Sequence, residues 1–193
     1  MVLDRSRSRS PATAGLALNW PRPFSKVPVP RTSKVGVAAV TDPGRSARFI
    51  YRGAPELFSA AYGVALPTTP MRAHAEGDCA ALWLGPDEWL LLMPDAEGST
   101  IGAALSQSLV GQAASLVDVG HRQIGFSVTG PRVAELLNSG CPLDLDVAAF
   151  PVGMCTRTIL AKVEIILWRT AEDAFRIEIA RSLAPYAVEL LRE

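Results

Sequence analysis

The chain has 193 residues, which is enough for one domain or for two small subdomains that share a core. Its 19 basic and 19 acidic residues balance, and this argues against nucleic acid as the main partner. Three cysteines without paired spacing exclude a disulfide framework and a cysteine-rich zinc site. No apolar run approaches the ~20 residues of a membrane span. We therefore expect a cytoplasmic protein.

Residues 1–26 differ in composition from the rest of the chain. Arginine and serine alternate from Arg5 to Ser10, and four prolines follow between residues 21 and 30. Proline fixes φ and lacks a backbone donor, so we expect a flexible Arg/Ser/Pro-rich arm over 1–26. The Arg/Ser repeat is too short to indicate RNA binding by itself.

The next part of the chain, to about residue 112, predicts strands and two helices. Its expected elements, in chain order, are short strands at 34–40 and 48–51, a helix at 54–62, strands at 79–84 and 89–93, and a helix at 100–110. Pro55 suits a first helical turn and Gly63 a helix stop. The two later strands flank the turn signal from Gly85 to Glu88.

The last part of the chain repeats this alternation. Its expected elements are strands at 115–119 and 123–128, a helix between Gly130 and Gly140, one long strand at 155–168, a strand at 175–179, and a final helix capped by Ser182. Strands that pair as hairpins, with helices between them, predict an α+β fold. We expect two α/β-sandwich subdomains with mainly antiparallel sheets, over 27–112 and 113–193.

Motifs for independent catalysis are absent from the sequence. It has no G-x-S-x-G elbow, no glycine-rich phosphate loop and no dinucleotide fingerprint. His121 is the best single candidate for a general base or substrate contact, but it also suits a hydrogen-bonded residue at a strand end. Asp118 is either a ligand-binding carboxylate or the partner of Arg122 or a turn amide.

Cysteine and tryptophan positions also admit two interpretations. Cys141 is expected to follow a helix C-terminus, where the negative end of the dipole disfavours a thiolate. Packing as a small hydrophobic residue is therefore the favoured role of Cys141. Trp83 and Trp89 suit either a core or an interface, because interfaces are enriched in tryptophan and arginine.

Four strings, in this order, resemble the gamma subunit family of heterotetrameric sarcosine oxidase. They are Leu82–Leu91 (LWLGPDEWLL), Val117–Arg122 (VDVGHR), Gly140–Leu145 (GCPLDL) and Phe150–Thr158 (FPVGMCTRT). The resemblance covers roughly residues 35–193 and omits the arm. It marks candidate interface or motif positions at Trp83, Gly85, Pro86, Asp87, Trp89, Asp118, His121, Arg122, Cys141 and Arg157.

The resemblance implies a fold like that of the folate-binding aminomethyltransferases and a place in a complex with alpha, beta and delta subunits. That complex oxidatively demethylates sarcosine to glycine with peroxide formation, and passes a one-carbon unit to tetrahydrofolate. It carries FAD, FMN, NAD and zinc, none of which we expect this chain to bind. The family assigns gamma no catalytic residue, so a structural role is expected.

Two alternatives remain open from the sequence. The chain could act alone as a folate-binding one-carbon transfer module, which predicts binding of reduced folate to the isolated chain. The Arg/Ser arm could instead indicate an RNA-associated adaptor, although the neutral net charge argues against this.

Overall fold

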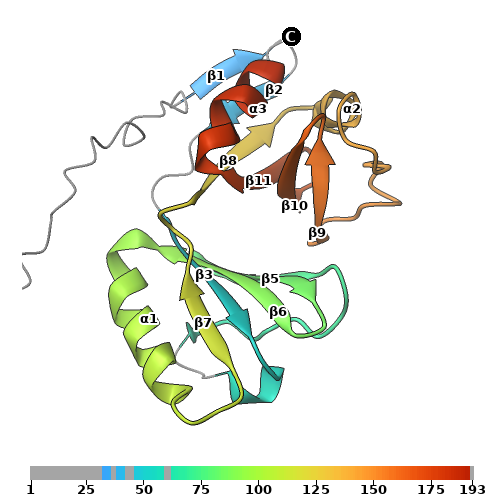
Figure 1. Cartoon of the computed structure of the whole chain (residues 1–193). Helices are drawn as coiled ribbons and strands as arrows, with labels where there is room; N and C mark the ends of the chain where they lie inside the picture. Colours follow the sequence, from blue (N-terminus) through green and yellow to red (C-terminus); the bar gives the residue numbers. More distant parts are fainter. Residues whose placement is uncertain (1–31, 36–37, 42–45, 59–61, 192–193) are drawn as a thin grey trace, which may run out of the picture.

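The computed structural model describes residues 32–35, 38–41, 46–58 and 62–191, so the predicted arm at 1–26 lies outside it (Figure 1). Two sheets dominate this part of the chain. The first has the order β4-β5-β6-β3-β7 and comprises β3 (Ser46–Arg52), β4 (Ala73–Glu76), β5 (Cys79–Gly85), β6 (Glu88–Pro94) and β7 (Ser115–Asp118). The second has the order β1-β2-β8-β11-β10-β9 and comprises β1 (Thr32–Val35), β2 (Ala38–Thr41), β8 (Gln123–Thr129), β9 (Cys155–Leu160), β10 (Val163–Ala171) and β11 (Ala174–Ala180).

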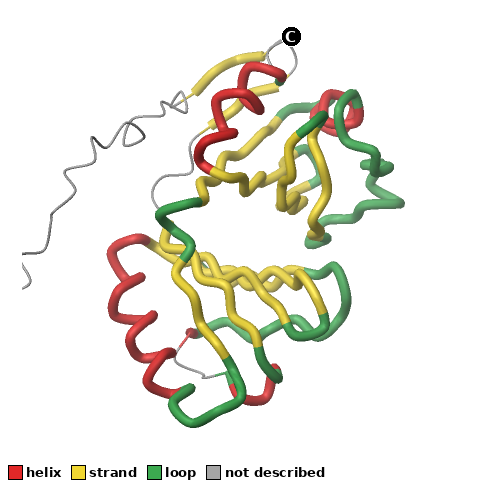
Figure 2. The backbone as a smooth tube through the Cα atoms, viewed as in Figure 1, coloured by secondary structure: helices red, strands yellow, loops and turns green. Residues whose placement is uncertain are grey.

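Helices cover the outer faces of these sheets. They are α1 (Asp95–Ser108), α2 (Val133–Asn138) and α3 (Ala184–Leu190). Two short 3₁₀ turns, η1 (Pro55–Leu57) and η3 (Arg181–Leu183), complete the helical elements of the described residues. Figure 2 shows α1 beside the lower sheet and α3 beside the upper one. The strand pairs within both sheets are antiparallel, so the predicted α+β class is confirmed.

Three apolar clusters hold the layers together. Leu105 of α1 packs with Phe49 and Leu91 on the outer face of the first sheet. Ala187 of α3 packs with Phe126 and Ile177 in the core of the second sheet, and Leu137 of α2 belongs to the same cluster. The third cluster lies between the sheets and comprises Ala80, Leu82, Leu90, Leu92, Val119, Cys155 and Ile166. Burial of this third surface joins the two sheets.

The chain crosses between the sheets more than once. β2 pairs with β8 in the second sheet, whereas β7 pairs with β3 in the first. The strand pairing therefore crosses the predicted boundary at residues 112/113 in both directions. The boundaries of the two expected subdomains, 27–112 and 113–193, remain a prediction.

Two predicted elements differ in kind from the structure. The predicted strand 155–168 is a hairpin of β9 and β10, and it turns at Ala161 with a φ of 53°. That left-handed conformation favours glycine, so a turn at alanine gives no sequence signal. The predicted helix 54–62 is only η1 in the described residues, because Phe58 is extended with ψ at 129°, and residues 59–61 lie outside the description.

Element boundaries account for the remaining differences. The predicted strand 34–40 is divided between β1 and β2, and the exposed strand β4 was not predicted. Helix α1 begins at Asp95 rather than at residue 100, with Asp95 and Glu97 favourably placed in its positive first turn. Ser182 lies within η3, and no side chain caps α3.

Candidate functional site

The facing surfaces of the two sheets combine the third apolar cluster with charged side chains from both sheets. Polar residues that alternate along β8 and β11 are not on an outer surface, because they face the first sheet. Glu178 of β11 is 1% exposed and Arg48 of β3 is 3% exposed. Buried charges are costly unless they are paired, so the arrangement of these charges decides how the sheets fit together.

The buried ion-pair cluster joins Arg48, Glu178 and Arg176. Nε of Arg48 donates to Oε2 of Glu178 at 2.6 Å, and Nε of Arg176 donates to Oε1 at 2.8 Å. Gly125 lies opposite Glu178 on β8. A Cβ at residue 125 would lie 2.3 Å from Oε1 of Glu178, so glycine provides the space for this carboxylate. The cluster links β3 of the first sheet with β11 of the second.

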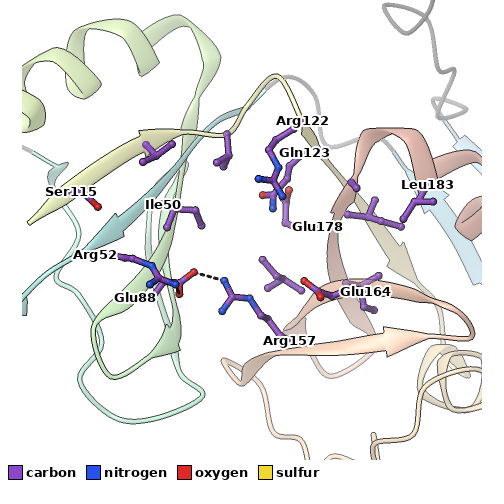
Figure 3. Close-up of a pocket in the computed structure, with 16 residues that line it drawn as sticks. Ile50, Arg52, Glu88, Ser115, Arg122, Gln123, Arg157, Glu164, Glu178 and Leu183 are labelled. Atoms are coloured by element: carbon purple, nitrogen blue, oxygen red, sulfur yellow. Dashed lines mark hydrogen bonds and ion pairs between the residues drawn. The ribbon is translucent and has the colours of Figure 1, made fainter.

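A second ion-pair cluster joins Arg52, Glu88 and Arg157 nearer the surface. Glu88 begins β6 directly after the turn at Pro86 and Asp87, and it accepts hydrogen bonds from both arginines. Figure 3 shows Arg157 reaching across from β9 to Glu88. Both clusters therefore use one glutamate and two arginines to connect the sheets.

The ionisation of Glu88 is controlled by these arginines. Burial raises the pKa of the Glu88 carboxyl. The hydrogen bonds and charges of Arg157 and Arg52 lower this pKa by more than burial raises it, so it lies below its usual value of 4.5. A carboxyl held ionised in this way suits an ion pair. It does not suit a general acid, which needs a raised pKa.

We expect a pH-dependent contribution of Glu88 to stability. Because folding lowers this pKa, the stabilisation is present above the unfolded value near 4.5 and is lost as pH falls through the folded value. Glu88→Gln should lower the free energy of unfolding by about 1 kcal/mol at neutral pH, because both arginines are partly exposed. Urea unfolding of both proteins should show this difference shrinking towards pH 3, and an equal difference at both pH values would contradict it.

A cavity of about 490 Å³ lies between the sheets beside these clusters. Its polar lining includes Arg52, Glu88, Arg122, Arg157 and Glu178, which Figure 3 shows around the central space. Its apolar lining includes Ile50, Val117, Val119, Ile165, Ile166, Ile179 and Leu183. The structure thus brings together two of the predicted site residues, Arg122 and Arg157.

The loop between β7 and β8 is fixed from both sides. Oδ1 of Asp118 accepts the backbone N–H of Gly120 at 2.8 Å, which is the turn-amide alternative predicted for Asp118. Nη2 of Arg181 donates to the Gly120 carbonyl at 3.1 Å and to the Gln123 carbonyl at 3.3 Å. His121 is exposed, outside the cavity lining.

Arg169 organises the loop that contains the GCPLDL and FPVG strings. It is 3% exposed, and its Nη1 donates to the carbonyls of Leu145 and Phe150, both at 2.9 Å. Its Nε donates to the Glu172 carbonyl at 3.1 Å, and the guanidinium lies 4.8 Å from the centre of the Phe175 ring. Cys141 is buried in the same core, as expected for a small packing residue. These strings therefore surround a buried arginine, which the sequence analysis did not identify.

The tryptophan motif occupies the β5–β6 hairpin. Trp83 and Trp89 are cross-strand partners, and Nε1 of the buried Trp89 donates to the Pro67 carbonyl at 2.8 Å. Trp83 is half-buried and packs against the apolar cluster on the outer face of the first sheet, which contains Phe49 and Leu91. Gly85 ends β5, and the exposed Pro86 and Asp87 form the turn. The motif thus builds the hairpin that positions Glu88.

The described part of the chain does not favour a reactive thiolate at Cys155 or a metal site. Burial raises the pKa of the Cys155 thiol to about 12 despite opposing effects of the Trp83 carbonyl and Arg72, which disfavours a reactive thiolate. No three His, Cys, Asp or Glu side chains gather as metal ligands among these residues. None of the described helices is long and apolar enough to span a membrane.

The residues that carry the inter-sheet pairing, Arg48 and Glu178, were not predicted from the sequence. Arg48 and Glu178 are 130 positions apart, so no local spacing indicates their contact. A charged residue at an alternating strand position predicts an exposed face, which is the usual but here incorrect interpretation. A glycine inside a strand, such as Gly125, is a sequence signal for a close approach at that point, but it does not identify the partner.

Comparison with known proteins connects this fold to one family. A family model described as sarcosine oxidase, gamma subunit, matches residues 53–193. The sarcosine oxidase subunit gamma of Arthrobacter sp is 34% identical over 147 residues, which cover 75% of this chain and 66% of that protein. Its counterpart from Corynebacterium sp. (strain P-1) is 32% identical over 161 residues, covering 82% and 73%.

Two solved structures share the fold. A chain of heterotetrameric sarcosine oxidase from Corynebacterium sp. U-96, in complex with pyrrole 2-carboxylate, matches with a TM-score of 0.76 and 26% identity, covering 83% of this chain and 84% of that chain. Aminomethyltransferase T of the Bartonella henselae glycine cleavage system matches with a TM-score of 0.63 and 14% identity, covering 80% and 45%. The second likeness shows the predicted fold alone. The chain belongs to the sarcosine oxidase gamma subunit family.

Proposed function

We propose that this chain is the gamma subunit of a cytoplasmic heterotetrameric sarcosine oxidase and assembles with alpha, beta and delta subunits. The observation that carries this proposal is the match to a chain of such an oxidase, which covers most of both chains. The complex would convert sarcosine to glycine with peroxide formation and pass the one-carbon unit to tetrahydrofolate. FAD, FMN, NAD and zinc would be held by the other subunits.

The role of this chain in the complex is structural. Its buried inter-sheet carboxylates, Glu88 and Glu178, are engaged in ion pairs, and its family strings build a hairpin and a loop around Arg169. Such an arrangement gives a rigid body, which suits a subunit that fixes the relative position of larger partners. We assign no catalytic, cofactor or metal position to it.

The candidate interface positions divide by burial. Trp89 and Cys141 are 1% and 5% exposed, so we assign them to the stability of the chain. The exposed residues Asp87, His121 and Arg122 are available for contact with a partner. Arg157 is 40% exposed and combines its internal ion pair with a place at the cavity, so its loss affects both.

The proposal is tested by purifying a tagged copy of the chain from its native organism. We expect three companion subunits, flavin absorbance and sarcosine-dependent peroxide in the eluate. A colourless chain without companions would contradict the subunit role. The isolated chain would then be titrated with reduced tetrahydrofolate, because micromolar binding would support the alternative of a stand-alone one-carbon module.

A further inference from the structure

The cavity between the sheets has apolar lining that the described chain leaves partly uncovered. Val117 of β7 is 52% exposed, and Leu183 of η3 is 38% exposed. Val117 lies on β7, the last strand of the first sheet, whereas Leu183 lies on η3, which directly follows β11 of the second sheet. A molecule that occupied the cavity would bury this apolar surface, and burial of apolar surface favours binding.

The cavity region also carries an excess of positive charge. Its lining includes the carboxylates of Glu88, Glu164 and Glu178. Arg52, Arg122 and Arg157 line it as well, so the charges of the lining itself balance. The guanidiniums of Arg48 and Arg176 are outside the lining and bind Glu178. Five guanidiniums therefore accompany three carboxylates. Such a surface favours a partner with negative charge.

Arg122 is the guanidinium that is free to bind this partner. Figure 3 shows it extending from the β7–β8 connection into the space between the sheets. Among the described residues it has no ion pair or side-chain hydrogen bond, whereas the other four arginines bind glutamates. A planar guanidinium binds a carboxylate through two parallel hydrogen bonds.

An unsatisfied amide lies next to it. Oε1 of Gln123 is buried without a hydrogen-bond partner in the described chain, and Gln123 also lines the cavity. Buried acceptors of this kind normally have a donor, and a peptide backbone supplies N–H groups. The cavity volume, about 490 Å³, suits a few side chains rather than a folded element.

We propose that a short segment of a partner subunit inserts into this cavity. An aspartate or glutamate of the segment pairs with Arg122, an N–H group donates to Gln123, and apolar side chains pack between Val117 and Leu183. The inference rests on the proposed function, because it requires a partner subunit. A second copy of this chain is a poorer occupant, since a symmetric contact would bring like charges together.

The test compares Arg122→Glu with Lys162→Glu in the full chain, each titrated against the complex of the remaining three subunits. Lys162 is an exposed residue between β9 and β10, so both variants reverse one positive charge. Arg122→Glu should weaken the affinity at least about tenfold, whereas Lys162→Glu should change it by less than about twofold. Circular dichroism melting checks the fold of each variant, and Arg122→Gln replaces the first if it melts early.

Other outcomes separate this inference from the proposed function. If the wild-type chain assembles, and both Arg122→Glu and Arg122→Gln bind the other subunits with the same affinity as the wild type, the inference is overturned. The subunit role would then remain intact. Failure of the wild-type chain to bind would instead contradict the subunit role itself. Native mass spectrometry of the chain alone tests the second copy, because a dimer that Arg122→Glu dissociates would overturn insertion of a partner segment.

Discussion

Replacement of Glu178 by glutamine is expected to lower the free energy of unfolding by about 3–5 kcal/mol. The side chains of Glu178 and Arg48 are 1% and 4% exposed, so the variant leaves a buried guanidinium without its counter-charge. Glutamine has nearly the shape of glutamate, and no cavity contributes to the loss. Because the pair joins β3 to β11, the effect extends to the contact between the sheets.

Urea unfolding followed by circular dichroism at neutral pH measures this loss. Glu164→Gln is the matched control, because Glu164 is exposed on β10 and lines the same cavity. It should change the free energy of unfolding by less than about 0.5 kcal/mol. Equal effects of the two variants would contradict the assignment of Glu178 as the buried link between the sheets.

Replacement of Arg169 by methionine has the second largest expected effect. It should lower the free energy of unfolding by about 3–4 kcal/mol. Methionine retains an unbranched apolar chain, but the carbonyls of Leu145, Phe150 and Glu172 lose their donors. Each buried acceptor left without a partner costs roughly 1–3 kcal/mol. The loop that Arg169 binds, 141–152, should also become more dynamic.

Two measurements on the Arg169→Met variant separate its global and local effects. Chemical unfolding gives the free energy, and amide hydrogen exchange should show faster exchange in residues 141–152. Arg132→Met is the control, because Arg132 is 61% exposed and pairs with Glu135 at the surface, where about 0–1 kcal/mol is expected. Unchanged exchange in the loop would show that Arg169 does not organise it.

Local patterns predicted the α+β class and most of the strands. The alternation of Ile124, Phe126 and Val128 identified β8, and the tryptophan motif identified β5 and β6. These elements have one strongly apolar face, which residue periodicity reports directly. The hairpin at Ala161 was missed because alanine carries no turn signal, although it adopts a φ of 53° there.

The candidate site depended on information that periodicity does not contain. The polar face of β11, with Arg176 and Glu178, has the pattern of a solvent-exposed surface. In the structure this face packs against the first sheet, and its charges find partners on β3. A period of two separates the faces of a strand but does not say what covers each one. Arg122 and Arg157 were identified through the family strings, whereas Arg48 and Glu178 were not.

The most direct test of the account is to prepare the oxidase from its native organism with and without this chain. Sedimentation of the two preparations and their sarcosine-dependent peroxide production would be measured side by side. We predict that the preparation lacking the chain sediments as smaller particles and loses activity, that adding the purified chain restores both, and that the chain alone produces no peroxide. An intact and fully active complex without this chain, or peroxide production by the chain alone, would contradict its role as a structural subunit.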